Sequence, residues 1–498
     1  MARHASTAPA GDLIRIKDGG GAPASCWRHG GPTVRDHPPI PGLAMPGRLQ
    51  APSPPLVALA GRPVPRYTSY PTAPHFHAGV DQATYRRWLG ELSPCASLSV
   101  YLHVPFCAAM CAYCGCHTKV TRREQPVEQY RDRLIREIHL VAAATVARRV
   151  THLHWGGGTP TMLGAEGLAA IVERLSLCFD LQPALDHAIE LDPRQVAPGL
   201  AGDLARIGIT RASLGVQDLN PHVQAAIGRI QPVETVAAAV AALRDAGLCD
   251  ISFDLMYGLP GQTVGDVERS TAAALRLKPD RIALFGYAHV PWLKRHQRLI
   301  DETALPGPVD RLGQEAAARA AIIAAGYEAI GLDHFALPGN AMAAAARAGR
   351  LRRNFQGYTT DRADALIGLG ASAIGQLPQG FVQNAPDLAG YARTIDGRAF
   401  ATTRGLRLTP EDRLRGAVIE RLMCDLSADL DQAAGRLDAD PRPLHADAAA
   451  LAPLAQHGVV RFDGRSVTVP EAGRPYLRLV ASAFDSHLGR AGRHSRAV

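Results

Sequence analysis

The feature that most limits the fold of this chain is an alternation of short β-rich runs with amphipathic helical stretches, which begins near residue 97 and continues to residue 287. The strand candidates are LSVYLHV (98–104), THLHW (151–155), HAIEL (187–191), RASLGV (211–216), ISFDLMY (251–257) and RIALFGY (281–287). Repeated β-then-α units predict an α/β fold with a parallel sheet and outer helices, either a barrel or an open doubly wound sheet. Six units are too few to close an eight-fold barrel, so a barrel would be a partial, TIM-like (β/α)6 arrangement.

The N-terminal flank differs from this core. Residues 1–64 show no hydrophobic period and are rich in Gly and Pro, so we expect a disordered extension. Residues 1–66 hold eight Lys/Arg against three Asp/Glu and so supply +5 of the formal net charge of +8, which means that the basic balance says little about the folded body. Met45 lies inside the extension and is an alternative candidate for the translation start.

After residue 300 the alternation weakens and helical stretches dominate, so we expect a barrel extension and linker over 301–400 and a mostly helical domain over 401–498. The end of the chain follows the order helix, strand, Asp463-Gly464 turn, strand, helix, which predicts a winged-helix-like element. DNA binding is not expected, because the helix DAAALAPLAQ lacks cations for phosphate contacts. No window is apolar enough for a membrane span or a secretory signal, so we expect a cytoplasmic protein.

Four cysteines lie within ten positions in CAAMCAYCGC, residues 107–116. A disulfide framework is unusual in a large cytoplasmic chain, and zinc normally needs a second ligand pair about 12 to 20 residues away, which does not follow. Closely spaced thiolates on one loop suit a 4Fe-4S cluster instead. The spacing C-x3-C-x2-C of Cys107, Cys111 and Cys114 can leave one iron open, and Cys116 is then surplus to ligation.

A run of three glycines ends the second strand candidate, in HLHWGGGTPT, at the kind of strand end where α/β proteins bind ligands. Without Cβ atoms the backbone there can approach a ligand closely. The cysteine motif after the first strand and WGGGTPT after the second together resemble the radical S-adenosylmethionine (SAM) superfamily. The resemblance implies that SAM chelates the open iron and that electron transfer splits SAM into methionine and a 5'-deoxyadenosyl radical.

Within that superfamily the chain is similar to the oxygen-independent coproporphyrinogen III oxidases, from about residue 60 to the C-terminus. The similarity rests on PRYTSYPTA (65–73), YLHVPFC (101–107), CGC (114–116), LHWGGGTPT (153–161), IELDPR (189–194), SLGVQD (213–218), DLMYGLPGQT (254–263), FGYAHVP (285–291), GLDHFALP (331–338) and RNFQGYTT (353–360). The implied core is a radical SAM partial barrel over 97–300.

The resemblance also implies the site residues. The cluster ligands would be Cys107, Cys111 and Cys114. The contacts to the cluster-bound SAM would be Tyr101, Gly157, Glu190 and Ile374. The contacts to a second SAM would be Tyr113, Gly158, Thr159, Gln217, Arg229, Asp254 and Ala288. These types suit the ligand, because carboxylates can pair with an ammonium or a ribose hydroxyl and a guanidinium with a carboxylate.

The segment PRYTSYPTA is characteristic of the oxidases, and related heme-trafficking proteins lack it. Arg66 would supply a charge partner, and Tyr67 and Tyr70 stacking faces, for a flat polycarboxylate tetrapyrrole. The resemblance thus implies a substrate-proximal N-terminal segment over 65–96, and the alternative interpretation of PRYTSYPTA is a proline-rich strap packed on the barrel. Cys116 marks the same subfamily, either as a residue that packs the loop or as one that lies near the substrate.

The activity implied by the resemblance is the conversion of two propionates of coproporphyrinogen III to vinyl groups, which yields protoporphyrinogen IX and two CO2. The alternative is a heme-binding or heme-delivery protein that keeps the cluster without the oxidase activity. The implied partners are the tetrapyrrole and a reduced flavodoxin- or ferredoxin-type electron donor, and the family is generally monomeric. No nucleic acid and no membrane span are expected.

Overall fold

The computed structural model describes residues 53–489 and 495–497 and contains all six predicted strands. Their bounds are β1 Ser97–Val104, β4 Arg149–Gly157, β5 Asp180–Leu191, β6 Arg211–Gln217, β7 Asp250–Tyr257 and β8 Arg281–Gly286. Neighbours in this order pair in parallel. The predicted partial barrel of parallel strands is therefore confirmed.

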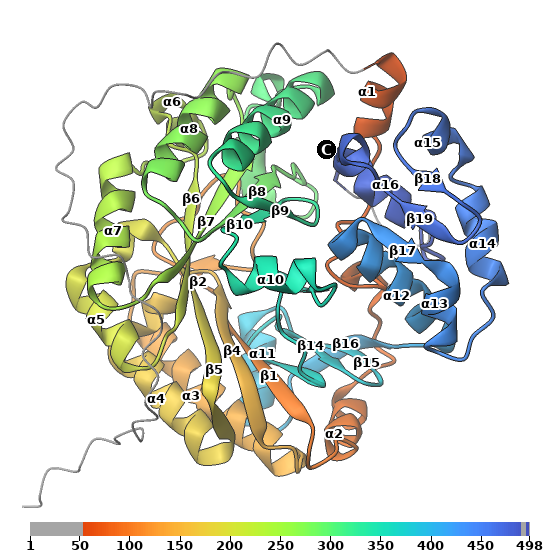
Figure 1. The fold of residues 1–498 in the computed structure, drawn as a ribbon. Coiled ribbons are helices and arrows are strands. Elements are labelled where there is room, and N and C mark those ends of the chain that lie inside the picture. The colour runs from red at the N-terminus through yellow and green to blue at the C-terminus, as the bar shows by residue number, and fades with distance from the viewer. Residues whose placement is uncertain (1–52, 490–494, 498) are drawn as a thin grey trace, which may run out of the picture. The chain divides into compact units, whose positions relative to one another are not determined.

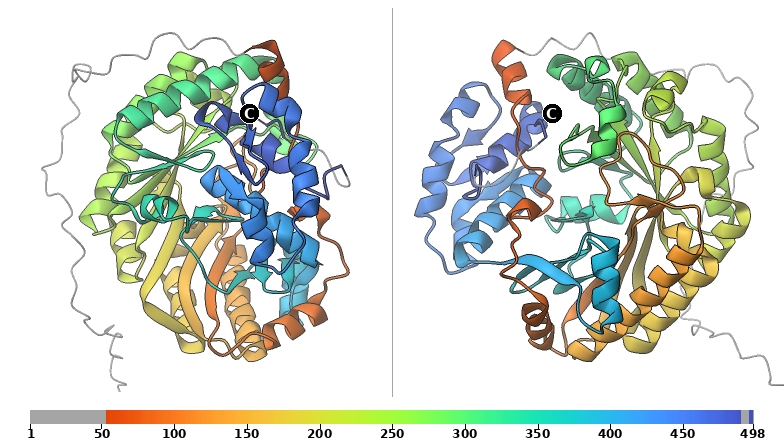
Figure 2. Two further views of the ribbon diagram at one scale, coloured as in Figure 1. Left: turned by 45° about the vertical axis from the view of Figure 1, so that its right-hand side comes forward. Right: turned by 180° about the vertical axis from the view of Figure 1, so that it is seen from behind.

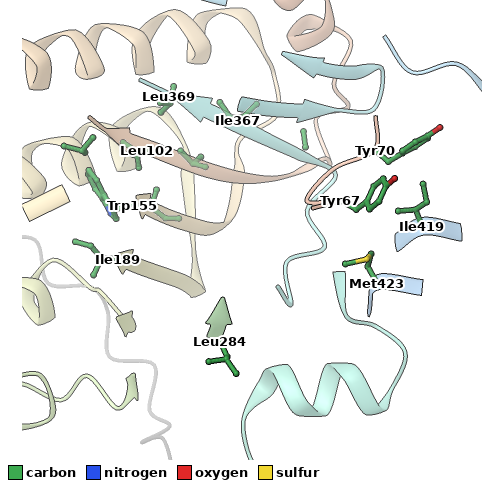
Figure 3. Close-up of a cluster of buried hydrophobic side chains, with 14 of the residues drawn as sticks. Tyr67, Tyr70, Leu102, Trp155, Ile189, Leu284, Ile367, Leu369, Ile419 and Met423 are labelled. Carbon is green, nitrogen blue, oxygen red and sulfur yellow. The ribbon is translucent and has the colours of Figure 1, made fainter. Parts of the chain in front are cut away.

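Helices cover the outer face of these strands (Figure 1). The covering helices are α3 Gln125–Ala144, α4 Gly164–Cys178, α5 Pro198–Arg206, α6 Pro221–Ala226, α7 Val233–Asp245, α8 Val264–Arg276 and α9 Pro308–Ala324. In α3 the residues Val127, Leu134 and Val141 recur every seven positions and are buried, because that spacing keeps them on one helix face. Leu102 and Trp155 from neighbouring strands lie together in the core (Figure 3).

The sheet is larger than the sequence indicates. β13 (Ala365–Leu369) pairs in parallel with the free side of β1. The antiparallel additions are β14 Ile374–Leu377, β15 Gly380–Asn384 and β16 Thr402–Arg407 on this edge and β10 His334–Ala336 and β9 Glu328–Ile330 beyond β8, which gives twelve strands. The expectation that helices dominate after residue 300 was wrong for 328–407, because strands of three to six residues are too short to show a period.

The C-terminal region is mostly helical, as predicted. Its helices are α12 Pro410–Asp425, α13 Leu430–Gly435, α14 Arg442–Ala449, α15 Ala452–Gln456 and α16 Leu477–Ser482. A small antiparallel sheet joins β17 Ser427–Asp429, β19 Ser466–Thr468 and β18 Arg461–Phe462, with the Asp463-Gly464 turn between β18 and β19. The winged-helix-like element stays a prediction. No helix in the described ranges combines the length and the apolarity that crossing a membrane requires.

The N-terminal segment departs from expectation. Residues 1–52 lie outside the described residues, but 53–64 are not disordered, since Pro54–Ala60 forms α1 with Pro in its first turn. Residues 62–77, which we name the N-terminal strap, then run between the barrel and the C-terminal helices to α2 (Gln82–Gly90) (Figure 2, right). The strap pairs with the C-terminal tail at Pro63 and with β16 through His77, so contacts far away in sequence order it.

Candidate active site

The predicted site is built around the loop between β1 and α3, residues 105–124, which we name the cysteine loop. Its base is closed because β2 (Phe106–Cys107) pairs in parallel with β3 (Lys119–Val120). The Thr159 N–H, just after β4, donates to Phe106 O at 2.7 Å. The cysteine loop is therefore held at the C-terminal ends of both β1 and β4, the end of the barrel where the other predicted site residues lie.

Two of the predicted ligand thiols accept hydrogen bonds from neighbouring elements. Cys107 Sγ accepts from Thr118 Oγ1 at 3.1 Å and from Thr159 Oγ1 at 3.6 Å. The buried Cys111 Sγ accepts from Arg229 Nη1 at 3.5 Å. Hydrogen bonds to the sulfurs and nearby positive charge are the usual means by which a protein tunes an iron–sulfur cluster.

The third thiol, Cys114 Sγ, accepts from the Cys116 N–H at 3.4 Å. Hydrogen bonding by Cys116, first through its thiol and also through its N–H, lowers the pKa of Cys114 and so favours the thiolate that ligation needs. Among the described residues, no three or more His, Cys, Asp or Glu side chains lie close enough together to hold a single metal ion. The fit to a cluster rests instead on the donor chemistry, three thiols on one loop that each accept a hydrogen bond.

The glycine run at the end of β4 lets protein groups pack closely. A Cβ on Gly157 would stand 2.6 Å from the His103 ring, and one on Gly158 would stand 2.5 Å from Phe106 O. Gly157 also has φ +109°, which L side chains rarely adopt. The sequence prediction assigned the missing Cβ atoms to ligand approach. The structure shows that they first allow β4 to pack against β1 and the cysteine loop.

Glu190 on β5 lies beside the glycine run. Its carboxylate accepts from the Gly157 N–H at 3.1 Å and lies 3.3 Å from His154 Nε2. Burial alone would raise the pKa of Glu190, but these hydrogen bonds and the neighbouring imidazoles hold it below its usual value. On β1, Tyr101 OH lies 3.0 Å from His103 Nδ1. The arrangement keeps an ionised carboxylate next to the cysteine loop, where it can pair with an ammonium group.

Arg229 follows α6 and reaches the cysteine loop from the other side. Its guanidinium donates to Gly215 O at 2.8 Å and forms an ion pair with Asp192 at 3.2 Å. Its Nε is buried and has no partner among the described residues, which leaves a donor for a further acceptor. Gln217 ends β6 with φ +64°, and its amide fills the space where a Cβ of Gly215 would stand.

Asp254 on β7 faces the inside of the partial barrel. Ser213 on the adjacent β6 donates to Asp254 Oδ2 at 3.2 Å. Burial first, and the negative charge of Glu190 second, raise the pKa of Asp254 to about 7. This carboxyl group can therefore either donate or accept a hydrogen bond near neutral pH.

The remaining predicted SAM contacts come from three separate elements. Gln297 Nε2 donates to both Tyr113 O (2.9 Å) and Ala288 O (3.3 Å), so it joins the cysteine loop to the segment after β8. Ile374 begins β14, and its carbonyl oxygen closely approaches Gly368 on β13, next to β1. The structure thus brings the predicted contact residues to one end of the barrel, while their roles toward a ligand stay predictions.

The two tyrosines of the N-terminal strap do not lie as predicted. Tyr67 and Tyr70 are only 3% and 8% exposed. The Tyr67 OH donates to Asp485 Oδ2 at 2.9 Å, and the Tyr70 OH lies 3.0 Å from Ser486 Oγ. Both rings lie beside α12 in the core (Figure 3), so neither offers a stacking face to a tetrapyrrole in this structure. They are packing residues, as the alternative interpretation holds, but they pack against the C-terminal region and not against the barrel.

Arg66 differs from these tyrosines because its side chain is exposed, with Nη2 donating to Gly286 O at the end of β8 at 2.7 Å. Sequence reasoning missed Arg353, which donates to a strap carbonyl at 3.0 Å and stacks over the Tyr358 ring at 4.3 Å. Its buried Nη1 has no partner among the described residues. Neither arginine forms an ion pair within the described ranges, although the charge of Asp333 acts on both.

Comparison with known proteins gives a consistent result. Residues 101–273 match the model of the radical SAM superfamily, and 408–476 match that of the HemN C-terminal domain. An oxygen-independent coproporphyrinogen III oxidase of Bradyrhizobium diazoefficiens is 49% identical over 87% of this chain and 97% of its own, and one of Paracoccus denitrificans is 42% identical over 87% and 96%.

A solved structure agrees with these relatives. The coproporphyrinogen III oxidase (HemN) of Escherichia coli, described as a radical SAM enzyme, superposes with a TM-score of 0.81 at 36% identity over 85% of this chain and 98% of that one. Identity of this size over nearly the whole length of the relatives includes both the barrel and the C-terminal region. This chain therefore belongs to the family of oxygen-independent coproporphyrinogen III oxidases, within the radical SAM superfamily.

Proposed function

We propose that this chain catalyses the oxygen-independent oxidative decarboxylation of coproporphyrinogen III to protoporphyrinogen IX in heme biosynthesis. Two propionates become vinyl groups, and two CO2 are released. The observation that carries the proposal is the convergence of three thiols, the glycine run and the ionised Glu190 at one end of the partial barrel, in a chain of this family.

The donor set supports a 4Fe-4S cluster on the three thiols of the cysteine loop, with one iron open to SAM. A cluster held there would supply the electron that cleaves SAM to a 5'-deoxyadenosyl radical, which would take one hydrogen atom from a propionate; loss of CO2 and of one further electron to an acceptor would then form each vinyl group. The contribution of the chain is orientation. Glu190 is proposed to hold the SAM ammonium, with Tyr101, Gly157 and Ile374 as further contacts, and the hydrogen bond that fixes the Glu190 carboxylate at Gly157 supports this. Because the radical reacts over a short distance, the position of the propionate decides the selectivity.

A second SAM would lie on the other side of the cysteine loop. The residues proposed to contact it are Tyr113, Gly158, Thr159, Gln217, Arg229, Asp254 and Ala288. Two observations support this assignment. The buried Nε of Arg229 is available for a carboxylate, and the pKa of Asp254, about 7, allows it to bind a ribose hydroxyl in either protonation state.

The exposed Arg66 and the neighbouring Arg353 are proposed to bind carboxylates of the tetrapyrrole, since guanidinium groups recognise carboxylates in a bidentate manner. Cys116 is exposed and belongs to the same loop as the cluster ligands. We therefore propose that it lies near the substrate. We further propose that the enzyme works in the cytoplasm as a monomer and receives electrons from a reduced flavodoxin- or ferredoxin-type protein.

Anaerobic incubation with SAM, a chemical reductant, an electron acceptor and coproporphyrinogen III tests the proposal. We expect vinyl product and two CO2 per tetrapyrrole from a preparation with a full iron load. Stoichiometric heme binding by such a preparation, with no vinyl product, would instead support the heme-delivery alternative. Loading must be checked by iron analysis first, so that an inactive preparation is not mistaken for a different function.

A further inference from the structure

The segment after β8, PWLKRHQRL (291–299), combines cations with exposed apolar side chains, and we name it the basic loop. It has no Asp or Glu, and its Lys and Arg residues are Lys294, Arg295 and Arg298. Its exposed apolar side chains are Trp292 (44% exposed), Leu293 (68%) and Leu299 (78%). Three cations within nine residues are a local concentration, because all of residues 67–498 together carry only +3. Large apolar side chains grouped with charge on a surface are typical of a binding site.

The inner side of the basic loop is fixed to the cysteine loop. Three of its side chains bind backbone carbonyl oxygens there, in the pairs Lys294 Nζ to Cys116 O (2.9 Å), His296 Nε2 to Cys114 O (2.6 Å) and Gln297 Nε2 to Tyr113 O (2.9 Å). Arg295 and Arg298 lie between and after these residues, are exposed, and form no hydrogen bond or ion pair within the described part of the chain. The basic loop therefore has an inner side that holds the cysteine loop and an outer side that is cationic and apolar.

The place of the basic loop suggests its use. In the proposed function the cluster must accept one electron for each SAM that is cleaved, and the carrier that supplies the electron is oxidised by one electron. Electron transfer becomes slow over long distances, so the carrier must dock close to the thiols. A protein seated on the outer side of the basic loop is separated from the cysteine loop only by the residues that bind it.

We propose that the basic loop is the docking surface for an acidic one-electron carrier protein. The cations would steer and orient the acidic carrier, and the exposed Trp292 and Leu293 would supply the apolar centre of a transient interface. This inference rests on the proposed function, but it assigns to the basic loop a role that the chemistry at the substrate does not need.

The double variant Arg295→Glu/Arg298→Glu tests the assignment. Both side chains lie outside the hydrogen bonds that hold the cysteine loop, so the cluster and the fold should persist. The matched control is Arg350→Glu/Arg436→Glu, which reverses two exposed arginines on other elements. Holoenzyme of each form is assayed with reduced flavodoxin, with reduced ferredoxin and with dithionite. The affinity for the oxidised carriers is measured separately by calorimetry at low and high salt.

We expect the basic-loop variant to lose carrier affinity and carrier-driven SAM cleavage by about tenfold or more, with dithionite-driven cleavage unchanged. Wild-type affinity should fall as salt rises, and the control should behave as wild type. Equal carrier affinity in wild type and variant would overturn the proposal. The proposal would also be overturned if the wild type, but not the variant, bound phosphatidylglycerol vesicles while both had the same carrier affinity. That result would identify a membrane surface as the occupant. Absence of vinyl product with dithionite would contradict the proposed function but not the docking proposal, because the carrier affinity measured by calorimetry tests docking separately.

Discussion

The cysteine loop and the N-terminal strap both carry segments typical of the family, but they use their polar groups in opposite ways. In the cysteine loop the thiols accept hydrogen bonds, and a buried donor beside the loop, Arg229 Nε, has no partner among the described residues. In the strap the tyrosine hydroxyls are already hydrogen-bonded to Asp485 and Ser486. A sequence motif therefore identifies a family without showing whether its side chains face a ligand or the core.

Arg478 makes this difference sharper. Its buried guanidinium donates to Pro65 O at 2.9 Å, to Val64 O, and to Arg496 O at 2.8 Å, so it ties the strap to the C-terminal tail. Burial first, and the positive charge of Arg66 second, lower the pKa of Arg478 to about 9, because the charged guanidinium loses its hydration. Arg478 thus holds the strap through its backbone carbonyl groups, and Arg66 extends from the strap to the end of β8.

The largest effect is expected from the cluster ligands. Cys107→Ser, Cys111→Ser or Cys114→Ser should each abolish the visible absorption of the cluster and most of the bound iron, because a hydroxyl is a poor substitute for a thiolate ligand. Iron analysis and absorption spectra measure this. Cys116→Ser is the matched control on the same loop and should keep its iron. A full iron load in any of the first three variants would refute the ligand assignment.

A smaller but still large effect is expected at the glycine run. Gly158→Ala places a Cβ 2.5 Å from Phe106 O, so the cysteine loop must shift away from β4. We expect SAM affinity to fall by about tenfold or more, since a displacement near one ångström is costly at a preorganised site. Equilibrium dialysis measures the affinity. Gly115→Ala is the control, because its Cβ would meet nothing within 4 Å, and equal losses in both variants would contradict the packing argument.

The third prediction concerns Glu137, whose contribution to the unfolding free energy should depend on pH. Glu137 is 1% exposed and accepts from Gly370 N–H, Asn384 Nδ2 and Tyr391 OH, which fixes the turn between β13 and β14. Burial raises the pKa of Glu137 from 4.5 to about 7, with these hydrogen bonds opposing the shift. The folded state therefore binds this proton more tightly than the unfolded state does.

The stability that this proton contributes is fully present below pH 4.5 and is lost as pH rises through about 7. We expect the unfolding free energy of the wild type, relative to Glu137→Gln, to fall by about 1 kcal/mol per pH unit across this window and to level off above it. Denaturant unfolding of both proteins at several pH values measures the difference. Parallel pH profiles of the two proteins would show that Glu137 does not titrate there.

The smallest effects separate the two kinds of strap residue. Arg66→Ala should reduce coproporphyrinogen turnover by about tenfold, equivalent to about 1.4 kcal/mol, and leave SAM cleavage intact. Tyr67→Phe should lower the unfolding free energy by about 1 to 2 kcal/mol, because it leaves Asp485 without its buried donor, and should leave turnover of the folded enzyme unchanged. If Arg66→Ala impaired SAM cleavage and turnover equally, Arg66 would be a packing residue like Tyr67.

Much of the core was predictable because its signals are local. Strand runs such as 98–104 and 251–257 show their period within a few residues, and the spacing of Cys107, Cys111 and Cys114 is a property of the chain alone. The edge strands were not predictable for the opposite reason. β13 has five apolar or glycine residues and no period, and only its pairing with β1 makes it part of the sheet.

The sequence by itself thus determined the positions of the parallel strands along the chain, the thiol spacing and the resemblance to the family, because these depend on neighbours within one segment. Only the tertiary structure decided that Tyr67 and Tyr70 are buried, that Arg353 lies beside the strap, and that the basic loop covers the cysteine loop. Those contacts join residues at least 178 positions apart, and no local pattern specifies which distant surface a side chain will meet.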